Sequence, residues 1–146
     1  MKFALCNEMF EGRPLEEVLE DLVYAIQEAV GFNVVLLNVV ERDSLALRRV
    51  AAAGLPLSVF NELRQRTQQL STIQEGLREE FRISHSYYIP HQYKELTKEW
   101  DVFTPLRDTT DHGEGYWHAE DMLLVPLRST DGRVLGLISV DAPRDG

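Results

Sequence analysis

Two apolar runs near the C-terminus, separated by a short turn, constrain the fold of this chain more than any other feature. The runs cover residues 123–128 and 133–140, and Thr130, Asp131 and Gly132 lie between them. Asp-Gly supplies the positive φ angles that a tight hairpin turn requires. The pattern therefore predicts a β-hairpin at the end of the chain.

A helix and a second pair of strands are predicted in the first third of the sequence. Residues 15–30 place apolar side chains at helical spacing, with acidic residues on the opposite face and Gly31 at the end. Residues 33–41 form a nearly continuous apolar run, which is typical of a central strand buried on both faces. Residues 45–53 read as its partner strand. Hairpins at both ends favour an antiparallel sheet with helices packed on it, an α+β architecture.

The middle of the chain is more polar and less periodic. Residues 57–69 are predicted to be helical, residues 72–80 to be a polar segment with a short helix, and residues 81–90 to be a strand. Residues 92–119 read as one long loop that carries several aromatic side chains. A loop of this length in a small domain is usually functional or mobile, so we expect residues 92–115 to be the most mobile part without ligand.

Composition narrows the classes of function. The chain has 146 residues, is 44% hydrophobic and carries a net charge of -9. This length predicts a single domain, and the charge argues against contact with nucleic acid or an anionic membrane. No segment reaches the roughly 18 apolar residues of a membrane helix, and no secretory signal pattern precedes residue 15. The only cysteine is Cys6, which excludes an internal disulfide. We therefore expect a cytoplasmic protein.

The order of these elements resembles that of GAF domains, small-molecule-sensing relatives of PAS domains. The resemblance covers roughly residues 15–141 and is greatest to the GAF modules of bacterial multidomain signalling proteins. The matching pieces are Ala29-Val30-Gly31-Phe32 with the strand 33–41, the segment 81–90, Val125-Pro126-Leu127, and Gly132 with Val134-Leu135-Gly136 and Ser139-Val140-Asp141.

The resemblance implies a particular arrangement. The sheet would have the strand order 2-1-5-4-3, with the terminal helices on one face and a ligand pocket between the other face and the long loop. Residues 1–14 would be an N-terminal linker or helix segment. Residues 15–146 would be a single GAF domain without the C-terminal helix that family members usually have, so we expect a fragment of a longer protein.

Two groups of side chains are candidates for binding a ligand. The first lies on or just after the predicted strand 81–90 and contains His85, Tyr87, Tyr88 and His91. The second precedes the closing hairpin and contains Asp111, His112, Glu114, Tyr116, Trp117, His118, Glu120 and Asp121. Aromatic rings beside hydrogen-bonding groups suit a polar ligand. From these groups we predict a ligand site with His85, Tyr87, Tyr88, His91, Tyr116, Trp117, His118 and Asp121. The alternative is that the aromatic side chains are core and anchoring residues, and that the histidines are ordinary surface groups.

Other kinds of chemistry have less support. His85, His91, His112 and His118 lack the spacing of a known metal motif, so no metal site is predicted. Some GAF-like proteins reduce free methionine sulfoxide with several cysteines, and others attach a bilin covalently within the domain. Cys6 lies before the domain and can do neither, so we expect no catalysis and no covalent bilin.

The resulting functional hypothesis is a non-catalytic sensor. It would bind a small molecule non-covalently, although no residue pattern selects cyclic nucleotides or another class. It would then signal to an attached output module, such as a histidine kinase or diguanylate cyclase. A GAF module without ligand, used only for dimerisation, is the alternative. The helix 15–30 carries apolar residues over a wide arc, so we expect a homodimer formed through the N-terminal helices.

Overall fold

A computed structural model describes residues 14–100 and 113–144. The helices and strands follow one another as an α+β sequence of elements. In chain order they are α2 (Leu15–Val30), β1 (Phe32–Val40), β2 (Ala46–Ala53), α3 (Leu57–Leu63), β3 (Thr67–Gln69), α4 (Leu70–Gln74), the 3-10 turn η1 (Glu79–Phe81), β4 (Arg82–Ile83), β5 (Ser86–Ile89), the 3-10 turn η2 (His91–Tyr93), α5 (Lys94–Thr97), β6 (Met122–Arg128) and β7 (Val134–Pro143).

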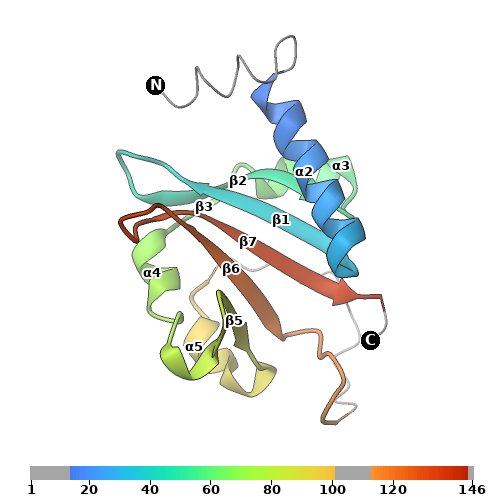
Figure 1. Ribbon diagram of the computed structural model, residues 1–146, viewed down its shortest axis with the longest axis vertical. Coiled ribbons are helices and arrows are strands. Elements are labelled where there is room, and N and C mark those ends of the chain that lie inside the picture. Colours follow the sequence, from blue (N-terminus) through green and yellow to red (C-terminus); the bar gives the residue numbers. More distant parts are fainter. Residues whose placement is uncertain (1–13, 101–112, 145–146) are drawn as a thin grey trace.

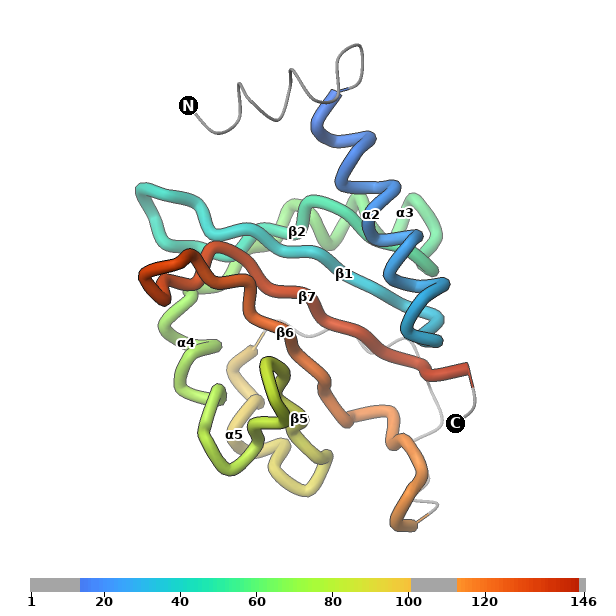
Figure 2. The backbone as a smooth tube through the Cα atoms, in the orientation of Figure 1, coloured from blue at the N-terminus to red at the C-terminus, as the bar shows by residue number. Residues whose placement is uncertain are grey.

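The strands form one antiparallel sheet with the order β3-β2-β1-β7-β6-β5-β4. The predicted closing hairpin is confirmed as β6 and β7, which run side by side in Figure 2. The sheet has seven strands rather than the five implied by the order 2-1-5-4-3. The difference comes from two short edge strands, β3 and β4, which the sequence pattern did not predict. The five central strands, β2-β1-β7-β6-β5, follow the expected order.

The predicted helix before β1 is confirmed as α2. Glu16 and Glu17 lie in its first turn, where the helix dipole favours negative charge, and Gly31 ends it with a left-handed φ of 75°. Figure 1 shows α2 lying across one face of the sheet. Its Val23 is completely buried against Val35 and Leu37 of β1, so this face of the sheet is covered by the helix.

The predicted loop 92–119 contains a short helix, α5 (Lys94–Thr97), which was not expected. Two other segments also differ from the sequence prediction. Residues 57–69 are not one helix, because α3 ends at Leu63 and the chain continues into the edge strand β3. Residues 81–90 are not one strand, because the chain turns at Ser84 and His85 and makes the small hairpin of β4 and β5. Ser84 has a φ of 58°, which a continuous strand does not allow. Both segments were too short for periodicity to separate a turn from a regular element.

A β-bulge in β2 determines which side chains point away from α2. Leu37 pairs with Ala51, whereas its neighbour Asn38 pairs with Arg49, so Val50 is an extra residue without a partner on β1. Partners in a ladder share a face of the sheet. Ala51 therefore faces α2 together with Leu37, and Arg49 faces the opposite side together with Asn38.

The second face of the sheet packs against side chains from α4 and from the described chain up to Trp100. Ile73 of α4 and Trp100 pack there with Leu47 of β2 and Leu124 of β6. Gly76 permits the approach of Trp100, because a Cβ at position 76 would lie 2.3 Å from the Cζ2 atom of the indole. The core thus has a layer on each side of the sheet.

Some sequence predictions lie outside the described residues. They concern the helix segment before residue 14, Cys6, and the part of the long loop that holds Asp111 and His112. In the described remainder of the chain, no helix is long and apolar enough to cross a membrane.

Candidate functional site

A cavity of about 80 Å³ lies on the sheet face opposite α2. Its floor comes from the central strands, including Leu36 and Asn38 of β1, Arg49 of β2, and Ser139 and Asp141 of β7. The other parts of the lining come from Gln68 of β3, Ile73, Trp100 and residues 119–122. The cavity therefore lies where the resemblance placed a ligand pocket, between the sheet and the segment that precedes β6.

One end of the cavity is formed by two buried polar side chains, Asn38 and Arg49. Each is only 6% exposed. The Nδ2 atom of Asn38 donates to the carbonyl oxygen of Leu137 at 3.2 Å, and Nη1 of Arg49 donates to that of Leu63 at 3.4 Å. A guanidinium carries five N–H donors, so its burial beside an amide marks this end of the cavity as polar.

The other end of the cavity is dominated by Asp141. Its Oδ1 atom accepts hydrogen bonds from the Trp117 indole Nε1 at 2.8 Å and from the Ala142 amide at 2.7 Å. Within residues 14–100 and 113–144, Oδ2 has no hydrogen-bond partner. Burial raises the pKa of Asp141 to about 6, and the neighbouring Asp121 adds to the rise, whereas the bonds from Ala142 and Trp117 oppose it. Asp141 is thus a half-desolvated carboxylate that is ionised at neutral pH.

The backbone beside Asp141 is strained. Ala142 has a φ of 54°, in the left-handed region that L-residues with a side chain rarely adopt. In this conformation its amide hydrogen bonds the preceding side chain. Trp117 holds the same carboxylate and packs edge-on against Phe32, with the ring centroids 5.5 Å apart. The position of Asp141 is therefore fixed from two sides.

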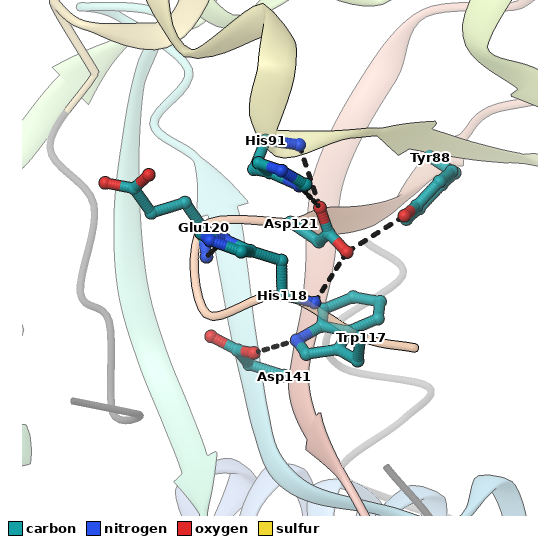
Figure 3. Close-up of polar contacts among 7 residues, drawn as sticks. All are labelled: Tyr88, His91, Trp117, His118, Glu120, Asp121 and Asp141. Atoms are coloured by element: carbon teal, nitrogen blue, oxygen red, sulfur yellow. Dashed lines mark hydrogen bonds and ion pairs between the residues drawn. The ribbon is translucent and has the colours of Figure 1, made fainter. Parts of the chain in front are cut away.

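The carboxylate of Asp121 joins several of the predicted site residues (Figure 3). Oδ1 accepts from the His91 amide at 2.8 Å and contacts the His91 Nδ1 at 3.0 Å. Oδ2 accepts from the Tyr88 hydroxyl at 2.9 Å and from the His118 amide at 2.8 Å. The side chain of Asp121 is only 2% exposed, so these bonds replace its hydration. We call Tyr88, His91, His118 and Asp121 the Asp121 cluster.

The two histidine rings of the Asp121 cluster are stacked, with centroids 3.8 Å apart and an angle of 15° between the planes. Nδ1 of His91 faces a carboxylate that can only accept, so this nitrogen carries a proton. Nδ1 of His118 instead accepts from the Glu120 amide at 3.0 Å. The two imidazoles thus have opposite tautomers when both are neutral, as assigned from their partners.

Among the described residues, one group of side chains has an arrangement that could hold a metal ion. It consists of His91, His118 and Asp121. One ligand atom from each lies within 4.8 Å of the others. However, both oxygens of Asp121 already accept hydrogen bonds, and His91 uses its Nδ1 proton in one of them. A metal would have to displace these bonds. The contacts favour a hydrogen-bonded junction that fixes the start of β6.

The structure brings together five of the eight predicted ligand-binding residues: Tyr88, His91, Trp117, His118 and Asp121. The other three lie elsewhere. His85 is exposed in the turn between β4 and β5, Tyr87 is buried in the core, and Tyr116 is 63% exposed. Glu114, from the wider group of candidates, is exposed.

The lining of the cavity differs from the expected one. We expected some of His85, Tyr87, Tyr88, Trp117 and His118 in its wall, but Asp121 is the predicted ligand-binding residue that lines it. Glu120, which belonged to the wider second group, also does. Tyr88 and His118 instead belong to the Asp121 cluster, and Trp117 packs against Tyr88.

Sequence reasoning missed the polar groups on the floor of the cavity. Asn38, Arg49, Ser139 and Asp141 all lie in β-strands that were interpreted as structural. A signal was present, because Asn38 interrupts an otherwise apolar run that was predicted to be buried on both faces. A polar side chain in such a strand is costly unless it has a partner.

Comparison with known proteins identifies the fold. The structure is similar to the GAF domain of an Acinetobacter phosphoenolpyruvate-protein phosphotransferase, with a TM-score of 0.58 and 18% identity over 94% of this chain and 72% of that one. It is also similar to a GAF domain/HD domain protein from Geobacter sulfurreducens, with a TM-score of 0.56 and 17% identity over 92% of this chain and 79% of that one. No family model and no curated protein matches the sequence.

Proposed function

We propose that this chain, which has the fold of a GAF domain, is a non-catalytic regulatory module that binds a small molecule and passes the signal to an attached output module in a bacterial cytoplasm. The observation that carries this proposal is the cavity on the face of the central strands opposite α2. Buried polar groups at both ends of an apolar hollow are typical of a site that orients a small ligand.

Strand β1 offers a route from the cavity to the helix. Leu36 lines the cavity, whereas its neighbours Val35 and Leu37 contact Val23 of α2 on the other face. A ligand that shifts β1 therefore has to shift the packing of α2, because buried side chains at native density transmit displacement. An output module connected through a terminal helix would sense that change.

A regulatory role without catalysis is also consistent with the Asp121 cluster. Each oxygen of Asp121 receives one backbone amide, from His91 and His118, so the carboxylate connects two segments of the main chain. This is what a structural junction requires. A general base would instead need a carboxylate directed at a reacting group.

The alternative function, dimerisation without ligand, is supported by the outer face of α2. Leu22 is 45% exposed, and it lies in one stripe with Leu15, Val18, Ala25 and Ala29. Leu15 and Val18 are half-buried, whereas Leu22, Ala25 and Ala29 are exposed beside the face that packs Val23 on the sheet. A homodimer through this helix is compatible with ligand binding on the opposite side, so the two functions can coexist.

A ligand screen tests the proposed function. Thermal shift would be measured with a library of small metabolites, and intrinsic fluorescence would follow Trp100 in a Trp117→Phe background. We expect a compound that stabilises the protein and changes the Trp100 emission, because Trp100 lines the cavity. Both effects should disappear in Ser139→Phe, which fills the cavity.

The matched control is Leu135→Phe, which adds a phenyl group to the same strand at a position that is 49% exposed. It should keep both effects. If hits are bound equally well by Ser139→Phe, they bind elsewhere and the proposed site is wrong.

A further inference from the structure

We propose that the cavity binds a small organic amine, whose protonated nitrogen pairs with Asp141 and whose apolar body lies over Leu36 and Leu124. This inference rests on the proposed function and specifies its ligand class. It depends on the free oxygen of Asp141, on the distribution of charge around the cavity and on the apolar middle of its floor.

The first argument is the geometry of Asp141. Trp117 and Ala142 both bind Oδ1, which leaves Oδ2 as the oxygen available to a ligand among the described residues. Figure 3 shows this second oxygen pointing away from Trp117. Asp141 itself lines the cavity. A carboxylate oxygen can only accept a hydrogen bond, so the complementary group must be an N–H or O–H donor.

The second argument is the local charge. Glu120 and Asp121 line the cavity together with Asp141, and the charge of Asp121 acts on Asp141. Arg49 is the cation among the described lining residues, and it pairs with Asn38 of β1. Asn38 lies four residues along β1 from Val34, which pairs with Asp141. Four residues of strand span roughly 13 Å. The charge at the Asp141 end therefore favours a cation over a neutral donor and disfavours an anion.

The third argument is the energetic state of Asp141. Burial raises its pKa to about 6, which means that the ionised side chain is under-solvated in the empty protein. An ammonium group at hydrogen-bond distance would supply the missing positive charge. A hydroxyl would satisfy the hydrogen bond but leave the charge uncompensated.

The fourth argument is the floor between the two polar ends. Leu36, Leu124 and Leu137 are 7%, 5% and 4% exposed, respectively, and all three line the cavity. This part of the surface fits an alkyl or other apolar body rather than a highly hydroxylated one. The ligand class is thus an amine with an apolar carbon skeleton, not a free ammonium ion or a sugar.

Three probes with four carbon atoms each and different polar groups test the inference: n-butylamine, 1-butanol and butyrate. Their binding would be measured by titration of the backbone amide NMR signals of the chain at neutral pH. We expect butylamine to bind at least tenfold more tightly than either of the others. The strongest shifts should fall on the amides of Asp141 and its neighbours.

The decisive variant is Asp141→Asn. The amide keeps an oxygen for Trp117 and Ala142 but presents no charge to the ligand, so the preference for butylamine should fall to less than threefold. Glu62→Gln, which removes an exposed charge from α3, should keep the full preference. A preserved preference in Asp141→Asn would overturn the inference.

The remaining outcomes separate this inference from the function on which it rests. Binding of butanol or butyrate as tight as that of butylamine, abolished by Ser139→Phe, would overturn the amine class and leave a ligand-binding cavity. Binding of none of the three would also overturn the amine class. The proposed function would then be decided by the metabolite screen, which does not depend on amines.

Discussion

The carboxylate of Asp121 binds both the backbone amide and the Nδ1 of His91, 30 residues earlier in the chain. His91 begins η2, which is separated from β5 by Pro90, and Asp121 directly precedes β6. The contact therefore connects the turn after β5 to the start of β6, and Asp121 also lines the cavity. A disturbance of this pair should affect the stability of the domain and the shape of the cavity together.

Asp121→Asn should destabilise the protein strongly. The amide can accept with one oxygen only, and its NH2 group would face donors that now bind the second oxygen. We expect the free energy of unfolding to fall by about 2–4 kcal/mol, the range for breaking a buried charged network. Urea denaturation measures this, and Glu120→Gln, at an exposed neighbour, should change it by less than about 0.5 kcal/mol. Equal effects of the two substitutions would show that the junction is not structural.

Asp141→Asn should stabilise the protein, and the gain should depend on pH. The folded pKa of about 6 lies above the usual value of 3.8 because the carboxyl is buried. Between these values the folded state binds more protons than the unfolded state, so the wild-type free energy of unfolding decreases as pH rises through this window. The variant has no carboxyl group at position 141, so its free energy of unfolding does not decrease in this way as pH rises. Its advantage should be small near pH 4 and reach about 2–3 kcal/mol above pH 7.

Denaturation of both proteins at several pH values gives this difference directly, since titrations common to both cancel. A constant difference from pH 4 to pH 8 would mean that the pKa of Asp141 is not raised. A larger advantage at the acidic end would reverse the assigned sign.

Tyr88 should be the last tyrosine to ionise. Burial and the hydrogen bond to Asp121 raise its pKa to about 12. Rapid-mixing absorbance titration of the five tyrosines should therefore show a late phenolate step that is absent in Tyr88→Phe. Tyr116→Phe, which removes an exposed ring, should retain that step. Loss of the late step in Tyr116→Phe would show that its assignment to Tyr88 is wrong.

Leu22→Glu should convert a dimer into a monomer. The structure makes Leu22 the informative choice, since Val23 is completely buried and its replacement would damage the core. A charge in the exposed stripe of α2 opposes burial of that stripe against a second copy. Light scattering in dilute solution measures the mass, and Glu20→Gln, on an exposed polar part of the same helix, should leave it unchanged. A monomeric wild-type protein would remove the dimer proposal.

The sequence predicted the elements whose patterns are long and regular. The helix 15–30 and the strands around residues 33–41, 45–53 and 123–140 were all identified, because their periodicity or turn chemistry repeats over many residues. The edge strands β3 and β4 have only three and two residues, and their pairing depends on neighbours far away in the chain. Local patterns carry no information about such pairings.

The site was harder to predict than the fold. The aromatic and histidine residues near residues 88–91 and 117–121 were recognised as two groups of candidates, and the structure brings members of both together. Their shared partner, Asp121, shows that much of this polarity serves the fold. Arg49 and Asp141 were not recognised, because the orientation of Arg49 depends on the bulge at Val50 and that of Asp141 on the ladder with β1.

The bulge in β2 also determines how this chain can change in length. Removal of Val50 would turn the ladder into a regular one, in which Arg49 still pairs with Asn38 and Ala51 still pairs with Leu37. Removal of Arg48 would instead move side chains on one side of the deletion to the opposite face of the sheet, because faces alternate along a strand. The affected side chains would be either those before position 48, such as Leu47, or those after it. Homologues of this domain that differ by one residue in β2 should therefore carry the gap at the bulge, and an arginine directly before that gap would retain its orientation toward the cavity.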